Sequence, residues 1–307
     1  MFEIFFLGTS ASAPSARRGL SSLLVKHNEH RFLIDCGEGT QRQILQSGIG
    51  FKSLNRILLT HGHLDHILGL GGLMSTFIRW ESIEHLEICA GRSVLERVKV
   101  LVNDVVLRGT TPPMMLSYRE ISPGLVYDED DFTVTAVPVT HRGPDCLGYI
   151  FEEKSRRPFL AEKADTLGIP FGRERSLLVN GQSITLANGS TIHPQDVLGE
   201  ELPGTKLAVI GDTGRAEELL PYVAGAHGLV IESTYLDVDV DMARQFSHLT
   251  ARDAAELAGK AGVGLLMLNH ISRRYREKEV LAEAQSIFPN TIVARDFDYY
   301  SVKKPEP

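Results

Sequence analysis

Four side chains that ligate divalent metals lie within six consecutive residues of this 307-residue chain. They directly follow the apolar run at residues 56–60 and are, in order, His61, His63, Asp65 and His66. Zinc accepts imidazole nitrogens and carboxylate oxygens, and a zinc site that keeps a position for water is of the catalytic kind. We therefore predict a dinuclear metal site. Because each ion needs three or more protein ligands, further ligands must come from elsewhere in the chain.

Three more candidate ligands each follow an apolar run in the same way. They are His141 after residues 133–140, Asp212 after residues 207–211 and His270 after residues 264–269. Short apolar runs bounded by turn residues are typical of buried strands. A lone histidine is more often an ordinary surface or core residue, and an aspartate in a Gly-Asp-Thr-Gly string also suits a turn. The incomplete site at residues 61–66 needs partners, however, and strands that end at one sheet edge would supply them.

Other strings of the chain are also distinctive. They are Phe-Leu-Gly-Thr-Ser at residues 6–10, Arg18 ahead of two serines, and Asp-Cys-Gly-Glu-Gly-Thr-Gln at residues 35–41. With these strings and the ligand string, nearly the whole chain resembles the metallo-β-lactamase superfamily and, within it, the ribonuclease Z family. The resemblance implies an α/β protein with a four-layer αβ/βα fold, a single domain over residues 1–307. It also implies a zinc-dependent endoribonuclease that removes the 3′ trailer from precursor tRNA, leaving a tRNA 3′-hydroxyl and a 5′-phosphorylated trailer.

The resemblance also implies how the ligands divide between two Zn²⁺ ions per subunit. One ion would be held by His61, His63, His141 and Asp212, and the other by Asp65, His66, His270 and the same Asp212. A water that bridges the ions would attack the phosphodiester, and Asp65 would take its proton. Mn²⁺ or Fe²⁺ also suits a site of histidines and aspartates, so the residues leave the metal open.

A general acid is needed because the departing ribose oxygen requires a proton. The resemblance implies that His248 supplies it and that Glu232 holds the His248 ring through a hydrogen bond. Thr250 and Asp253 form the pattern of a capping box, which predicts that His248 lies at a helix entrance. Without the resemblance, the sequence would favour His248 as a surface residue and Glu232 as an acidic residue at a strand end with no catalytic role.

A segment at about residues 152–204 is too long for a simple connection between strands. Residues 154–175 have a balance of +3, whereas the whole chain has a net charge of −7. Residues 164–170 resemble the base of the flexible arm by which ribonuclease Z binds tRNA, although the Gly-Pro tip of the family is missing, which leaves the arm's conformation open. The alternative is an ordinary solvated loop. We expect the basic residues of this segment to contact phosphates, and these residues are Lys154, Arg156, Arg157, Lys163, Arg173 and Arg175.

Composition bounds the remaining properties. The chain is 43% hydrophobic and 23% charged, which suits one large core. No apolar run is long enough to span a bilayer, and the N-terminal residues have no basic leader. Three widely spaced cysteines form no disulfide pattern, so we expect a cytoplasmic protein. The family resemblance further implies a homodimer.

Two other functions stay open. The ligand string by itself names a fold and a metal site rather than a substrate, so a small-molecule ester or phosphodiester hydrolase of the same fold is the first alternative. The second is a catalytically idle RNA-binding subunit, against which the presence of all seven ligands speaks. The residues do not show whether precursors that contain CCA are cleaved, or whether substrates other than tRNA are used.

Overall fold

The structure is a computed structural model that describes residues 1–80 and 83–303. The chain forms two compact units. The first, here called the body, comprises Met1–Glu152 and the chain from Thr205 onward. The second, here called the inserted unit, comprises Glu153–Gly204 and interrupts the body between two neighbouring strands of one sheet.

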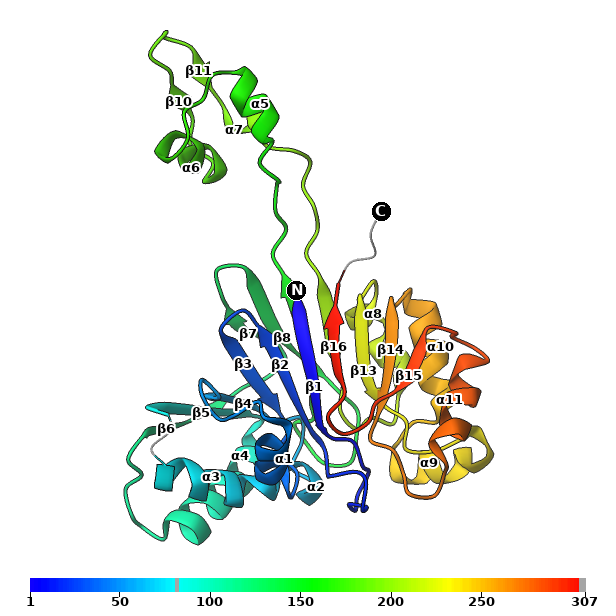
Figure 1. Cartoon of the computed structure of the whole chain (residues 1–307). Coiled ribbons are helices and arrows are strands. Elements are labelled where there is room, and N and C mark those ends of the chain that lie inside the picture. The colour runs from blue at the N-terminus through cyan, green and yellow to red at the C-terminus, as the bar shows by residue number, and fades with distance from the viewer. Residues whose placement is uncertain (81–82, 304–307) are drawn as a thin grey trace. The chain divides into compact units, whose positions relative to one another are not determined.

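The first sheet of the body is mixed, and in it the first strand of the chain lies beside the last (Figure 1). Neighbouring strands from β16 to β3 are antiparallel, and those from β3 to β6 are parallel. In spatial order the strands are β16 (Tyr299–Val302), β1 (Phe2–Gly8), β2 (Ser22–His27), β3 (His30–Ile34), β4 (Arg56–Leu58), β5 (His85–Ala90) and β6 (Met115–Glu120).

The second sheet is also mixed. Neighbouring strands from β15 to β12 are parallel, and β9 is antiparallel to β12. In spatial order the strands are β15 (Thr291–Val293), β14 (Leu265–Asn269), β13 (Gly228–Glu232), β12 (Lys206–Val209), β9 (Leu147–Glu153), β8 (Phe132–Pro138) and β7 (Gly124–Asp128). The apolar runs ahead of the predicted ligands are thus the strands β4, β8, β12 and β14, which confirms that prediction.

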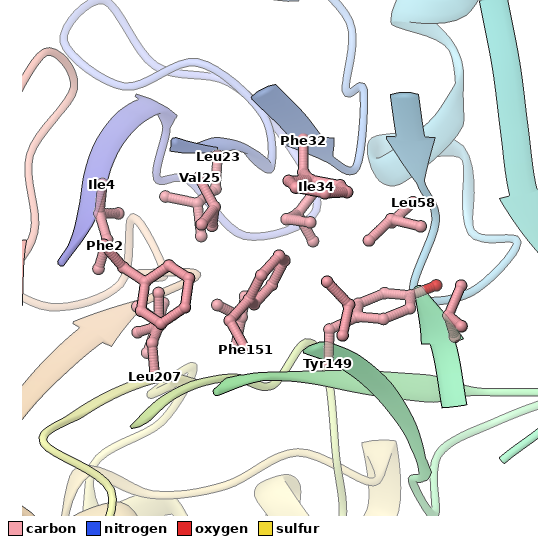
Figure 2. Close-up of a cluster of buried hydrophobic side chains, with 14 of the residues drawn as sticks. Phe2, Ile4, Leu23, Val25, Phe32, Ile34, Leu58, Tyr149, Phe151 and Leu207 are labelled. Atoms are coloured by element: carbon pink, nitrogen blue, oxygen red, sulfur yellow. The ribbon is translucent and has the colours of Figure 1, made fainter. Parts of the chain in front are cut away.

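The two sheets pack face to face through apolar side chains (Figure 2). Phe2 of β1 and Phe32 of β3 both lie against Phe151 of β9, with ring centroids 5.9 and 5.4 Å from its ring. Fully burying one such side chain contributes roughly 1.5–3 kcal/mol. The main core of the body therefore lies between the sheets and holds their strand ends in fixed positions.

Helices cover the outer face of each sheet. Ile57 of β4 packs in one cluster with Leu73 of α3, and Leu229 of β13 packs in another with Ala258 of α10. The layers are therefore helix, sheet, sheet and helix, which confirms the predicted four-layer αβ/βα fold. The helical segments of the first half are α1 (Thr40–Ser47), α2 (Leu64–Ile67), α3 (Gly69–Trp80), α4 (Arg92–Lys99) and the π-helix η1 (Val100–Leu107). Those of the second half are η2 (Ala216–Leu219), α8 (Leu220–Val223), η3 (Asp237–Asp239), α9 (Val240–Phe246), α10 (Ala251–Ala261) and α11 (Glu277–Gln285).

The inserted unit has a small apolar core of its own, formed by Ala164, Ile169, Leu178, Ile184, Ile192 and Val197. A two-stranded hairpin turns at Asn188 and Gly189, and the φ of 85° at Gly189 suits glycine. Its elements are α5 (Ala161–Thr166), α6 (Arg173–Val179), β10 (Ile184–Thr185), β11 (Thr191–Ile192) and α7 (Pro194–Val197). Among the residues described in either unit, no helix combines the length and the hydrophobicity that crossing a membrane requires.

Candidate metal centre

The strand ends of both sheets carry the predicted ligands. The string at residues 61–66 follows β4, and single ligand candidates follow β8, β12 and β14. All seven side chains lie together in two adjoining groups, and the potential ligand atoms of each group lie within 4.8 Å of one another. The first group is His61, His63, His141 and Asp212, and the second is Asp65, His66 and His270.

Asp212 lies between the two groups, and each of its carboxylate oxygens faces one of them. Oδ2 is 3.7 Å from Nε2 of His61 and 3.8 Å from Nε2 of His141. Oδ1 is 3.5 Å from Nε2 of His66 and 3.4 Å from Nε2 of His270. A carboxylate with this arrangement is placed to bridge two cations.

His63 and Asp65 complete the two groups. Nδ1 of His63 lies 2.9 Å from Nε2 of His61. Oδ2 of Asp65 lies 3.5 Å from Nε2 of His270 and accepts a hydrogen bond from the backbone nitrogen of Ser12 at 2.9 Å. Each group therefore has a ligand from the string at residues 61–66 and at least one from the second sheet.

The proton positions in this cluster favour a metal. Nδ1 of His141 lies 2.7 Å from the carbonyl oxygen of Ser247, and because that oxygen only accepts, Nδ1 carries the proton and Nε2 is bare. Nε2 of His66, Nε2 of His270 and Oδ1 of Asp212 are buried and have no hydrogen-bond partner. Buried polar atoms are normally paired, so nitrogens and carboxylate oxygens that converge without partners fit divalent cations. The cluster is compatible with a metal-binding site.

Burial also keeps the histidines of the first group neutral. It lowers the pKa of His61 and His141, and it lowers the pKa of His63 to about 4. Burial alone would raise the pKa of Asp212, but the charges of His270 and His66 outweigh it and hold that pKa well below its usual range. Near neutral pH the first group therefore presents neutral imidazoles and an ionised carboxylate, which are the forms that bind metals.

Asp35, directly after β3, holds two of the ligands in place. Its Oδ2 accepts hydrogen bonds from Nδ1 of His66 at 2.7 Å and from Oγ1 of Thr60 at 2.8 Å. Oγ1 of Thr60 in turn lies 3.0 Å from Nδ1 of His61. A carboxylate behind a ligating histidine fixes the ring and its tautomer. No role was predicted for Asp35 from the sequence, although it follows a buried strand and begins the distinctive string at residues 35–41.

Two residues of the site have a left-handed backbone, Asp35 with φ 59° and His270 with φ 55°. Such conformations cost about 1–3 kcal/mol each for non-glycine residues and gather at functional sites.

A glycine permits close packing near the site, because a Cβ added to Gly69 of α3 would lie 2.0 Å from the carbonyl oxygen of Gly37. A side chain at position 69 would therefore push the start of α3 away from the loop at Gly37.

The structure also brings the predicted acid pair together beside the metal ligands. Nδ1 of His248 lies 2.8 Å from Oε1 of Glu232, and both side chains are buried. The predicted capping box of Thr250 and Asp253 is confirmed at the start of α10. Burial alone would lower the pKa of His248, but the Glu232 carboxylate outweighs it and raises that pKa to about 9. His248 is therefore protonated near neutral pH and faces the cavity described next.

An open cavity of about 650 Å³ leads to the cluster, and its lining includes Asp212, Arg97 and Arg142. Arg97 donates a hydrogen bond to the carbonyl oxygen of Gly62 at 2.7 Å, between two ligands of the string. The guanidinium of Arg142 lies over the ring of Phe246, 5.6 Å from its centroid. Cationic walls around a candidate metal site suit an anionic substrate such as a phosphodiester.

The six basic residues predicted to bind the substrate lie in the inserted unit, in differing surroundings. Arg175 Nη2 lies 2.5 Å from Oδ1 of Asp165, and its guanidinium lies 3.7 Å from the ring centroid of Phe171. Arg157 Nε donates to the carbonyl oxygen of Gly199 at 2.8 Å. These two arginines thus make bonds within the unit. Exposure to solvent is shared by Arg157 and the remaining four residues, Lys154, Arg156, Lys163 and Arg173.

Charge is unevenly distributed along the inserted unit. Over residues 153–204 there are six Lys and Arg against seven Asp and Glu. The excess of positive charge at residues 154–175 is therefore balanced by acidic residues later in the unit. Any contact with phosphates would depend on which residues face the substrate rather than on the net charge of the unit.

Comparisons with known proteins separate the fold from the family. The family described as Anti-Pycsar protein Apyc1 matches residues 2–142, less than half of the chain. The fold is similar to the short form of human tRNase Z (TM-score 0.69, 22% identity, covering 98% of this chain and 99% of that one). It is similar to a diphosphatase from the PhnP family as well (TM-score 0.67, 16% identity, covering 99% and 98%).

Sequence identity is much higher to a ribonuclease Z of Bradyrhizobium diazoefficiens. That relative is 47% identical over 302 residues, which cover 98% of this chain and 100% of the relative. A fold shared with a diphosphatase does not select a family, whereas identity at this level over the full length does. The chain therefore belongs to the ribonuclease Z family, endoribonucleases with the metallo-β-lactamase fold.

Proposed function

We propose that this protein is a zinc-dependent tRNA-processing endoribonuclease that removes the 3′ trailer from precursor tRNA. The products would be a tRNA with a 3′-hydroxyl and a trailer with a 5′-phosphate. The observation that carries the proposal is the carboxylate of Asp212, whose two oxygens each face a separate set of histidine nitrogens. Membership of the ribonuclease Z family supports the choice of substrate.

Two Zn²⁺ ions suit the seven side chains, because five imidazoles and two carboxylates match the preference of zinc. The first ion would be held by His61, His63, His141 and Asp212, and the second by Asp65, His66, His270 and Asp212. When bound, such a pair lowers the pKa of a water and stabilises the charge that develops on a phosphate. Mn²⁺ and Fe²⁺ are the alternatives that the metal content of purified protein would reveal.

Two residues of the chain would move protons. Asp65 is ionised, because the hydrogen bond and charge of His270 and the charge of His66 outweigh burial and lower its pKa, so it can accept the proton of the attacking water. His248 carries a proton and can donate it to the ribose oxygen that leaves as the tRNA 3′-hydroxyl. Glu232 keeps that ring in place through its hydrogen bond to Nδ1.

The inserted unit would bind tRNA outside the cavity. Arg156, Lys163 and Arg173 are exposed and are the best placed to meet phosphates, together with Lys154. Arg157 and Arg175 would support them by holding the fold of the unit. A homodimer and a cytoplasmic location, which the family resemblance implies, stay predictions.

Cleavage of a 3′-extended precursor tRNA, with both fragment ends mapped, tests this proposal. We expect the zinc-loaded protein to cut next to the discriminator base, and Asp65→Ala to abolish the cut. A protein that leaves the precursor intact but hydrolyses bis(p-nitrophenyl) phosphate would be a small-molecule hydrolase of the same fold. That result would overturn the tRNA assignment while leaving the fold and the metal site intact.

A further inference from the structure

Two buried carboxylates, one in each half of the body, hold histidines in the same way. Asp35 accepts directly from Nδ1 of His66 at 2.7 Å and reaches Nδ1 of His61 through the hydroxyl of Thr60, with distances of 2.8 and 3.0 Å. The Asp35 carboxylate thus contacts one histidine directly and a second one through a threonine. A carboxylate, a threonine and two histidines in this arrangement are called a relay below.

The relay of the second half is built on Glu232. Its Oε1 accepts directly from Nδ1 of His248 at 2.8 Å. Its Oε2 accepts from Oγ1 of Thr234 at 2.5 Å, and the same Oγ1 lies 2.9 Å from Nδ1 of His270. Thr234 is 4% exposed, so no solvent replaces either bond. In the first relay both histidines are candidate ligands, whereas the second relay joins one candidate ligand to the candidate acid.

The direction of the single hydroxyl hydrogen of Thr234 decides which ring nitrogen of a neutral His270 carries the proton. Oε2 of Glu232 is the nearest acceptor of that hydrogen, at 2.5 Å against 3.3 Å to the carbonyl oxygen of His270, so the hydroxyl donates to Glu232. The lone pairs of Oγ1 are then left to accept from Nδ1 of His270. In the neutral imidazole that a metal requires as a ligand, the single proton then lies on Nδ1, and Nε2, the buried nitrogen that faces Asp212 without a partner, keeps its lone pair for the metal.

We propose that Thr234 is a positioning residue that fixes the ligating tautomer of His270 and couples that ligand to the His248–Glu232 pair. This inference rests on the proposed function, since it assumes that His270 holds one of two metal ions. Thr234→Val keeps the shape of the side chain but removes the acceptor, which leaves Nδ1 of His270 buried and unpaired. The tautomer with the proton on Nε2, which cannot bind a metal through the nitrogen that faces Asp212, becomes more favourable as a result.

The test compares Zn²⁺ affinities measured by competition with a chromophoric chelator. We expect Thr234→Val to weaken the binding of one of the two Zn²⁺ ions by about 10–100-fold and to leave the other ion tightly bound. A loss of this size is usual when the hydrogen-bond partner of a metal ligand is removed. Thr234→Ser retains the hydroxyl and should restore the affinity. The matched control is Thr291→Val, since Thr291 is equally buried and bonds the carbonyl oxygen of Phe288 away from the cluster.

A second measurement does not depend on any variant at position 234. Ring ¹⁵N shifts of metal-free wild-type protein, with the His270 signal identified by its loss in His270→Gln, should show the proton on Nδ1. A proton on Nε2, or a Thr234→Val protein that binds both ions as tightly as wild type, would overturn the inference. If wild type itself bound fewer than two ions, the proposed function would fail as well. Failure of the inference alone would look different, because wild type would then bind two ions and Thr234→Val would bind both as tightly.

Discussion

Tyr149 of β9 donates its phenol hydrogen to the carbonyl oxygen of Leu59, 2.6 Å away, inside the core between the sheets. Leu59 directly precedes Thr60 and the ligand string, so this bond ties the core to the start of the candidate metal centre. It is also a bond between the two sheets, because Leu59 follows β4 of the first sheet and Tyr149 belongs to the second.

Tyr149→Phe should therefore destabilise the body and disturb the start of the ligand string. Losing the hydroxyl group leaves the buried carbonyl of Leu59 without this donor, which costs about 1–3 kcal/mol. Urea unfolding of the metal-free protein measures the loss. Tyr222→Phe, on the half-exposed face of α8, is the control and should leave the free energy of unfolding unchanged. Equal stability of the two variants would show that the Tyr149 bond does not contribute.

The role of His248 predicts a difference between substrates. His248→Ala should lower kcat for precursor tRNA by about 10²–10⁴-fold, because the ribose oxygen leaves poorly without a proton. Hydrolysis of bis(p-nitrophenyl) phosphate should fall far less, since p-nitrophenolate leaves without one. His85→Ala, on the first sheet, should change neither rate. An equal loss on both substrates would indicate that His248 acts on the attacking side or on the metals instead.

Asp35→Asn should weaken metal binding rather than the fold. Asn tolerates the left-handed backbone at this position and keeps the size of the side chain, but it cannot fully replace the carboxylate that accepts from His66 and Thr60. We expect a loss of metal affinity of about 10–100-fold, measured by chelator competition. Asp241→Asn on α9 is the exposed control. Unchanged affinity in Asp35→Asn would contradict a positioning role.

Lys163 and Arg173 lie in the inserted unit and are predicted to contact phosphates. Replacing both by Ala should raise KM for precursor tRNA and reduce the salt dependence of binding, by about one unit of slope per lost contact. The rate on bis(p-nitrophenyl) phosphate should stay the same. Glu162→Gln with Glu174→Gln changes neighbouring charges in the opposite sense and should lower KM. Equal KM values in all three proteins would exclude a role for this charge in binding.

The fold, and the meeting of the seven candidate ligand side chains at strand ends, could be predicted from the sequence because both leave local patterns. Apolar runs at β4, β8, β12 and β14 each precede a potential ligand, but β4 belongs to the first sheet and the other three strands to the second, so the expectation of a single sheet edge was wrong. The family strings then selected the four-layer arrangement. The register of the strands and the π-helical turn at Val100–Leu107 have no comparable local signal.

The residues behind the ligands were missed for a physical reason. Thr60 and Thr234 are common hydroxyl residues, and what makes them notable is a contact with a carboxylate and a histidine that the folded chain brings together. Thr234 and His270, for example, are 36 residues apart. Charge counting likewise predicted Arg175 as a phosphate contact, but it could not show that Asp165 and Phe171 already surround this guanidinium.

The tRNA-processing function proposed for the body, with the inserted unit serving binding rather than chemistry, can be tested by removing the inserted unit. Because Lys206 of β12 pairs with Glu152 of the antiparallel strand β9, residues 154–204 can be replaced by an Asn-Gly turn that closes a hairpin. The body would keep all seven ligand side chains and its own core in this variant.

The decisive measurement is kcat/KM of the intact and shortened proteins on precursor tRNA and on bis(p-nitrophenyl) phosphate. We predict that the shortened protein loses about 10²-fold or more on the precursor, because a second binding site is gone, and keeps its rate on the small ester. If the shortened protein processed precursor as well as the intact one, or if neither protein cut it, the account would be contradicted.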